Sequence, residues 1–167
     1  MATQQNPFIY GKAIQYQLAA IVTPVPVYAA FNRNFATEPK FITWTLRNVH
    51  QPVYTGTTQS NKGIDRPVFQ ISIFTQSIED GFTISNQILQ ALHGYSGFFG
   101  GTTGWLNNAG QVITWTNVDL DTIGWTSPNT GAGFYISKAD VQWLYNSYDN
   151  ENKLAEIFLD CTIDVPT

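Results

Sequence analysis

The sequence contains few charged residues and little sulfur. Asp, Glu, Lys and Arg make up 12% of its 167 residues, about half of the usual share, whereas aromatic residues make up 14%. The single cysteine, Cys161, excludes an internal disulfide and a cysteine-based zinc cluster, and is interpreted as a small buried hydrophobe. The net charge of -4 argues against a protein that binds nucleic acid through its phosphates. A polar but weakly charged surface favours a subunit buried within an assembly.

Long hydrophobic runs are also missing. No apolar run approaches the roughly eighteen residues of a membrane span. The N-terminal MATQQNPF lacks a basic region followed by an apolar core, so we expect a protein that is made in the cytoplasm and has no membrane partner. A length of 167 residues suits one self-standing domain, which needs neither a metal nor a disulfide to hold its core.

The clearest strand signal lies within Arg66–Gly97, the stretch around which the rest of the chain is organised. Residues Pro67–Thr75 alternate with the two-residue period of a pleated strand, and Phe69, Ile71 and Ile73 share one face. Because proline cannot donate a ladder hydrogen bond, Pro67 is expected to begin this strand and not to lie inside it.

A helix is predicted directly after this strand. Ser77 is expected to cap its N-terminus, and the acidic residues Glu79 and Asp80 complement the positive end of the helix dipole. Five apolar residues are expected on the buried face, with Ser85 toward water: Phe82, Ile84, Ile88, Leu89 and Leu92. Gly94 then fits a left-handed residue that ends the helix.

Patterns elsewhere predict further elements. The N-terminal half is expected to contain a helix over Phe8–Ala20, an extended segment over Ile21–Tyr28, a strand over Lys40–Val49 and a long loop over Asn48–Ile64. The C-terminal half is expected to contain a loop over Gly94–Gly110, a strand over Val112–Leu120, a turn cluster over Ser127–Gly133, a strand over Phe134–Asn146 and a last strand over Ile157–Val165. In the strand over Phe134–Asn146, Tyr145 is expected on the same face as Ala139.

This order of elements predicts an α+β fold: an antiparallel sheet with two helices packed on one face, plus an extra C-terminal strand or arm. Residues 1–146 are expected to form the domain, and residues 147–167 a C-terminal extension of linker and strand. The pattern leaves open whether the last strand pairs with its own sheet or with a neighbouring subunit.

Candidate chemistry is sparse. The two histidines, His50 and His93, have no nucleophile motif beside them, and His93 is interpreted as a helix-end or surface residue. Asp119 and Asp121 flank one residue, a pattern more typical of a solvated strand edge than of a cation site. We therefore expect no catalytic residues, no cofactor, no metal and no enzymatic activity. One alternative is a carbohydrate-binding module that stacks sugars on Tyr95, Trp105, Trp125 and Tyr148, all in or beside predicted loops.

Several segments together resemble the tail-completion and tail-terminator proteins of long-tailed bacteriophages. The resemblance covers roughly Phe8–Asn146 and is carried by Val25–Tyr28, Pro39–Trp44, Val68–Phe74, Leu89–Gly97 and the strand Lys138–Tyr145. These motifs are patterns of strand and helix, with no invariant chemistry. The segment Tyr148–Thr167 extends past the usual last strand of the family.

The resemblance implies a structural virion protein in the neck of the particle, assembled in the host cytoplasm. Such a subunit forms a ring with copies of itself, typically a hexamer, which caps the tail-tube protein and docks to the head-side connector or stopper protein. DNA passes through the channel without sequence-specific binding. The alternatives are another neck component, such as a connector stopper or tail-tube relative, or the carbohydrate-binding virion module.

Subunit and partner contacts are expected on two segments. The long loop contributes His50, Tyr54, Thr57, Asn61 and Lys62, and the last strand contributes Ile157, Leu159 and Ile163 by adding to a neighbouring sheet. Deleting Asn152–Thr167 is then expected to weaken the ring without unfolding the domain.

Overall fold

The computed structural model describes residues 7–30, 37–55, 62–99, 103–107, 112–113, 125–130 and 134–166. In this part of the chain the helices are α1 (Pro7–Val22) and α2 (Ile78–Leu92). The strands are β1 (Val27–Ala29), β2 (Lys40–Thr55), β3 (Lys62–Thr75), β4 (Gly97–Phe99), β5 (Thr103–Asn107), β6 (Val112–Ile113), β7 (Trp125–Thr130), β8 (Phe134–Ile136), β9 (Lys138–Asp149) and β10 (Leu154–Pro166).

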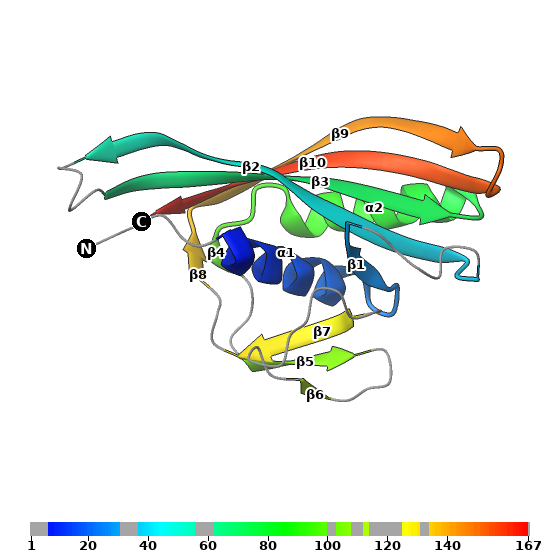
Figure 1. Ribbon diagram of the computed structural model, residues 1–167, viewed down its shortest axis with the longest axis horizontal. Coiled ribbons are helices and arrows are strands. Elements are labelled where there is room, and N and C mark those ends of the chain that lie inside the picture. Colours follow the sequence, from blue (N-terminus) through cyan, green and yellow to red (C-terminus); the bar gives the residue numbers. More distant parts are fainter. Residues whose placement is uncertain are drawn as a thin grey trace.

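One long sheet forms the framework. Among the described residues it has the order β6-β5-β7-β1-β2-β3-β10-β9, and β4 pairs with β8 separately. Its neighbouring strands are antiparallel, except that β1 and β2 run parallel. Both helices lie on the same side of the long strands β2, β3, β10 and β9 (Figure 1). The predicted α+β class with two helices on one face is confirmed. The sheet was predicted to be antiparallel, and in the described sheet only the β1–β2 pair differs from this.

Helix α1 is enclosed by its own chain. It lies between the long strands and the small β5–β7 part of the sheet (Figure 1). Its buried residues come from more than one side of the helix: Tyr10, Gly11, Ala13, Ile14, Gln15, Leu18, Ala19 and Val22. A helix that is buried on several sides has no single apolar stripe, which explains why its amphipathic pattern in the sequence is weak.

Helix α2 covers the sheet with one face only. Gly81 lies in its first turn, where an added Cβ would meet Ile157 Cδ1 at 3.0 Å and Thr75 Oγ1 at 3.1 Å, so this turn packs tightly on β3 and β10. The predicted stripe is wrong at two positions, because Ser85 is buried and Phe82 is 48% exposed. Ser77 is the N-cap residue but makes no side-chain capping bond, so the first-turn acids provide the favourable charge.

The predicted long loop over Asn48–Ile64 is wrong, because most of it is strand. β2 and β3 form a hairpin whose pairs continue through Val53–Ile64 and Tyr54–Gly63 to Thr55–Lys62, with two register shifts in β2. The alternation around Pro52 is irregular, so the strands do not show a strict two-residue period in the sequence.

Pro67 lies inside β3 and does not begin it. Its position is tolerated because the pairing of β3 with β10 passes from Asp65–Val165 to Val68–Thr162 and skips the two residues between them. There, the side chains of Arg66 and Asp164 form an ion pair across the gap. The missing N–H of proline therefore falls where the ladder is already interrupted.

The C-terminal half contains more strand than expected. β4 and β5 lie within the predicted loop Gly94–Gly110, and the first residues of the predicted turn Ser127–Gly133 belong to β7. The predicted strand Phe134–Asn146 is divided at Ser137 into β8 and β9. A register shift in β9 pairs Trp143 with Leu159 but Tyr145 with Phe158, so Tyr145 lies on the face opposite Ala139 and its predicted face is wrong.

The last strand, β10, forms as predicted and pairs with its own sheet. It lies between β3 and β9 and is antiparallel to both. β10 is therefore a central strand, and the division into a domain over 1–146 and an extension over 147–167 does not describe how the sheet is built. The resemblance covered the chain up to Asn146, which left the neighbour of β3 unassigned.

Candidate subunit and partner interfaces

The predicted contact residues of the first segment lie along the β2–β3 hairpin. His50 is exposed on β2, opposite Arg66. Tyr54 and Lys62 belong to the last described pairs of the hairpin, opposite Gly63 and Thr55. Thr57 and Asn61 lie outside the described residues. The structure thus brings His50, Tyr54 and Lys62 onto one projecting hairpin.

The predicted contact residues of the last strand belong to the core. Ile157, Leu159 and Ile163 are each 0% exposed, on the face of β10 that the helices cover. A side chain that is fully buried in its own subunit cannot contact a neighbour. The alternation of this strand was recognised correctly, but its apolar face packs inward.

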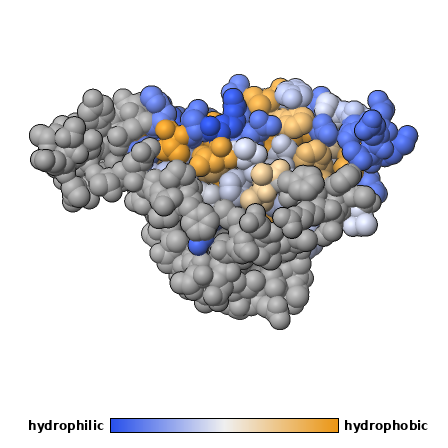
Figure 2. Space-filling model, in the orientation of Figure 1, coloured by the Kyte–Doolittle hydropathy of each residue, from blue (hydrophilic) through white to orange (hydrophobic). Residues whose placement is uncertain are grey.

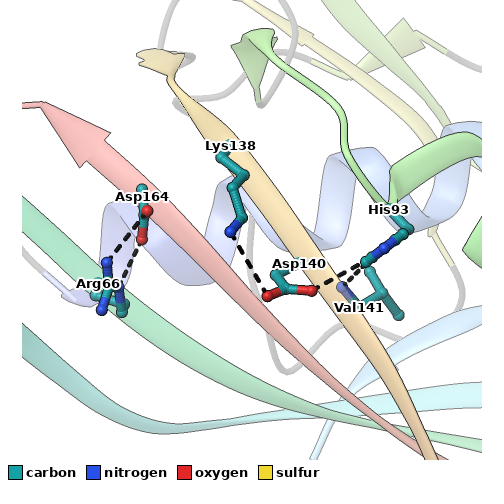
Figure 3. A network of polar contacts seen from close by, with 6 residues as sticks. All are labelled: Arg66, His93, Lys138, Asp140, Val141 and Asp164. Carbon is teal, nitrogen blue, oxygen red and sulfur yellow. Dashed lines mark hydrogen bonds and ion pairs between the residues drawn. The ribbon is translucent and has the colours of Figure 1, made fainter.

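Charged side chains on the long strands pair with one another. Arg66 Nε donates to Asp164 Oδ1 at 2.6 Å and its Nη2 to Oδ2 at 3.2 Å, and this hydrogen bonding raises the pKa of Arg66. Arg47 Nη1 contacts Asp160 at 3.0 Å, from β2 to β10. In Figure 3, Asp140 lies between Lys138 and His93, next to the Arg66–Asp164 pair. In these partly exposed pairs, the positive and negative charges on the face of the sheet opposite the helices are nearly equal in number.

His93 has a structural role at the end of α2. Its backbone N–H donates to the carbonyl of Leu89, and Gly94 follows in the left-handed conformation with φ of 79°. Its Nδ1 accepts a hydrogen bond from the backbone N–H of Val141 on β9 at 3.0 Å (Figure 3). The interpretation of His93 as a helix-end residue agrees with these contacts, because the nitrogen that a general base would use is bonded to the main chain.

Cys161 is fully buried in the main hydrophobic core. Burial raises the pKa of its thiol to about 12, so the nucleophilic thiolate is scarce at neutral pH. Within the described ranges, no group of three or more His, Cys, Asp and Glu side chains could hold a metal ion. Asp119 and Asp121 lie outside those ranges. The described helices include none that is long and apolar enough to cross a membrane.

The residues proposed for sugar stacking do not form one described surface. Trp105 lies within β5 and Trp125 begins β7, so both belong to strands. Tyr95 is partly buried against the core, whereas Tyr148 on β9 is 52% exposed. Trp44 is buried, and its indole nitrogen donates to Gln15 Oε1 at 2.6 Å.

A group of exposed aromatic side chains gathers instead around β9. Phe82 of α2 and Trp143 stack with ring centroids 6.5 Å apart, and Tyr145 lies 4.7 Å from the ring of Phe158. Trp143 is 37% and Tyr145 54% exposed. This group was missed because the register shift that turns Tyr145 over has no plain signal in the sequence. The sequence does indicate that this part of the strand is unusual, because Gln142–Tyr148 contains neither a charged residue nor a proline.

The described residues form an α+β fold with exposed aromatic side chains around β9. Comparison with protein-family models finds no match. Comparison with curated proteins finds none either.

Two solved structures are distantly similar to the chain. One is described as the virion of a native gene transfer agent particle, with 13% sequence identity and a TM-score of 0.44, over 95% of this chain and 92% of that one. The other is described as the sheath/tube terminator of an extracellular contractile injection system in its extended state. It has 11% identity and a TM-score of 0.44, and the match covers 99% of this chain but 58% of that one, less than two thirds of its length.

Proposed function

We propose that this chain is a ring-forming tail terminator of a bacteriophage-like particle. In this proposal, copies of the chain form a closed ring, a hexamer, at the head-proximal end of the tail. The ring caps the tail tube and joins it to the head-side connector or stopper, and its role is structural and not catalytic. The proposal is supported by the resemblance carried by Val25–Tyr28, Pro39–Trp44 and the helix ending at Leu92-His93-Gly94.

The observation that carries the ring is the projecting β2–β3 hairpin. Its distal end extends past both helices (Figure 1). The pairing of β3 with β10 ends at Ile64–Pro166, whereas β2 and β3 continue to Thr55–Lys62. In the described chain, this end of the hairpin is therefore a two-stranded ribbon. Because such a ribbon is marginally stable in water by itself, contact with a neighbouring subunit would stabilise it.

The charge distribution fits a ring around DNA. With a net charge of -4, the chain lacks the excess of Lys and Arg that holds phosphates tightly. Arg66 and Arg47 are paired with Asp164 and Asp160, so these guanidinium groups are partly neutralised. A channel of this composition would let DNA pass without sequence-specific binding.

Shortening the hairpin tests the ring. Replacing Tyr54–Gly63 by Asn-Gly, a favoured two-residue hairpin turn, keeps the pair Val53–Ile64. We expect the variant to remain folded by circular dichroism and to sediment as a monomer, whereas the parent sediments as a ring seen by negative-stain microscopy. An unchanged oligomer in the variant would remove the hairpin from the interface.

A pair of matched point variants tests the same surface without changing chain length. His50→Glu places a negative charge on the hairpin, and Gln90→Glu places the same charge on the exposed side of α2. We expect the first to weaken the ring and the second to leave it intact. Equal effects would indicate a general response to charge.

The role in the neck needs a test in the particle. Particles produced without this protein should consist of separate heads and tails, with tubes of uncontrolled length, and adding the purified ring should restore joining. Normal tube length with unjoined heads would favour the alternative of a connector stopper. Complete particles would contradict a neck function.

A further inference from the structure

β9 ends the described sheet on one side, and its outer edge is divided into two parts. The first part is covered by the segment after α2. Gly94 N–H donates to the carbonyl of Ala139 at 2.8 Å, Ala139 N–H donates to the carbonyl of Tyr95 at 2.8 Å, and Val141 N–H donates to His93 Nδ1 at 3.0 Å. The second part, Gln142–Tyr148, pairs with β10 on its inner edge. No described residue pairs with its outer edge.

The uncovered part lacks most of the features that protect free strand edges. Natural edge strands are usually short, or carry lysine or proline, which discourage another strand from pairing. Gln142–Tyr148 has the sequence QWLYNSY, without charge or proline, in a strand that runs to Asp149. The register shift beside Trp143 is the one irregularity of its pairing with β10. An edge of this kind is suited to receive an additional strand.

Apolar surface flanks the uncovered edge on both faces of the sheet. On the helix side, Phe82 stacks on Trp143, and an open cleft of about 400 Å³ is lined by Gln76, Ile78, Asn146, Ser147, Tyr148 and Ala155. On the opposite side, Tyr145 packs on Phe158. Alternate side chains of an incoming strand would therefore meet apolar surface on both faces. Figure 2 shows apolar residues along the upper part of the molecule.

The charges around this edge identify the kind of occupant. The first turn of α2 carries Glu79 and Asp80, and residues 149–156 carry Asp149, Glu151 and Glu156 against one basic residue, Lys153. In the described chain, Lys40 at the same end of the sheet lies on β2, separated from β9 by β3 and β10. Figure 2 shows the hydrophilic group at the end where β9 turns into β10. An incoming strand with basic residues at this end would complement these acids.

We propose that the outer edge of Gln142–Tyr148 binds an extended, basic segment of another protein as an additional strand. The segment carries apolar residues that pack beside Trp143 on one face and beside Tyr145 on the other, and it carries Lys or Arg at the end that lies next to the acidic end of the sheet. Main-chain hydrogen bonds provide affinity, and the aromatic side chains and acids provide selectivity. This inference does not depend on ring formation or on a position in the neck.

A displayed library of random twelve-residue peptides tests the proposal, with the full-length protein as the target. We expect the selected peptides to combine a stretch of apolar residues with Lys or Arg near one end. A synthetic selected peptide should slow amide hydrogen exchange within Gln142–Tyr148, and its affinity should fall as salt rises. Selection of acidic peptides, protection elsewhere in the chain, or failure to select any peptide would overturn the proposal.

Two variants separate edge binding from general surface binding. Tyr148→Lys introduces a charge at a 52% exposed position of the edge strand, and Gln90→Lys adds the same charge on the exposed side of α2. We expect the first to weaken peptide binding by about tenfold or more and the second to leave it nearly unchanged. Thermal unfolding of both variants shows whether they are folded. Equal affinities for folded Tyr148→Lys and the parent would overturn the proposal.

Light scattering distinguishes the remaining occupant, a second copy of the chain. If Tyr148→Lys reduces the oligomeric state of the protein and no basic peptide competes with assembly, β9 pairs with another subunit. That result would contradict the proposed basic partner. A parent oligomer unaffected by Tyr148→Lys, together with peptide binding, supports it.

Discussion

The two faces of the long sheet differ in what their side chains contact. On the helix face, adjacent strands contribute residues that are all 0% exposed, such as Ile71 on β3, Leu159 on β10 and Ile42 on β2. On the opposite face, the same strands contribute Gln70, Asp160 and Thr45, which are partly or fully exposed. Neighbouring residues of one strand therefore have different surroundings: those on one face form the core, and those on the other remain partly or fully exposed.

The largest effect is expected from removing β10, because this strand contributes residues to both faces of the sheet. Deleting Asn152–Thr167 removes the strand between β3 and β9 and its buried side chains. We expect the variant to lose cooperative unfolding in circular dichroism and to be insoluble. This replaces the expectation that the deletion leaves a folded domain. A soluble variant with a cooperative transition would show that β10 is dispensable.

Truncating one residue on each face of β10 compares the faces directly. Leu159→Ala removes a fully buried side chain, and we expect it to lower the free energy of unfolding by about 2–5 kcal/mol. Thr162→Ala, on the opposite face, is expected to change it by about 0.5 kcal/mol or less. Urea unfolding measures both values. Similar losses would mean that the open face is covered by another part of the chain.

The buried thiol allows the helix face to be tested by pH. Burial raises the pKa of Cys161 from 9.0 to about 12, so its contribution is complete below pH 9 and is lost as pH rises toward 12. When the pH is raised from 8 to 10, we expect the free energy of unfolding to fall by about 1 kcal/mol more for the parent than for Cys161→Ala. The thiol should also react with an aromatic disulfide reagent only after unfolding. Rapid reaction of the native protein would place Cys161 outside the core.

The smallest effect is expected for the ion pairs of the open face. Asp164→Asn breaks a two-point contact with Arg66, and we expect a loss of about 0.2–1 kcal/mol at low salt that shrinks as salt is added. Asp140→Asn, whose contact with Lys138 Nζ is 3.8 Å long, should cost less. A loss larger than that of Leu159→Ala would reverse the roles of the two faces.

Local patterns predicted much of the helix face. The alternation of Phe69, Ile71 and Ile73 and of the last strand identifies buried residues correctly, because side chains on a strand alternate between faces. Helix α2 was located by its flanking acids and by Gly94. The class of fold followed from the order of these elements.

The interfaces were less predictable because they depend on pairings between distant segments. No local pattern states that β10 lies between β3 and β9, and so Ile157, Leu159 and Ile163 were expected at a surface. One additional residue in β9, opposite Phe158 and Leu159, moves Tyr145 to the other face. Phe82 was expected in the core because helical spacing does not show where a sheet ends.

The position of β10 also has a consequence for the order in which the sheet can close. Arg66 and Asp164, which face each other across β3 and β10, are 98 positions apart in the chain. During synthesis, the inner edges of β3 and β9 therefore stay unpaired until β10 is made, and the loop that must close is long. A growing chain exposes main-chain groups that the finished subunit hides, and its yield should depend on how quickly this last central strand finds its place.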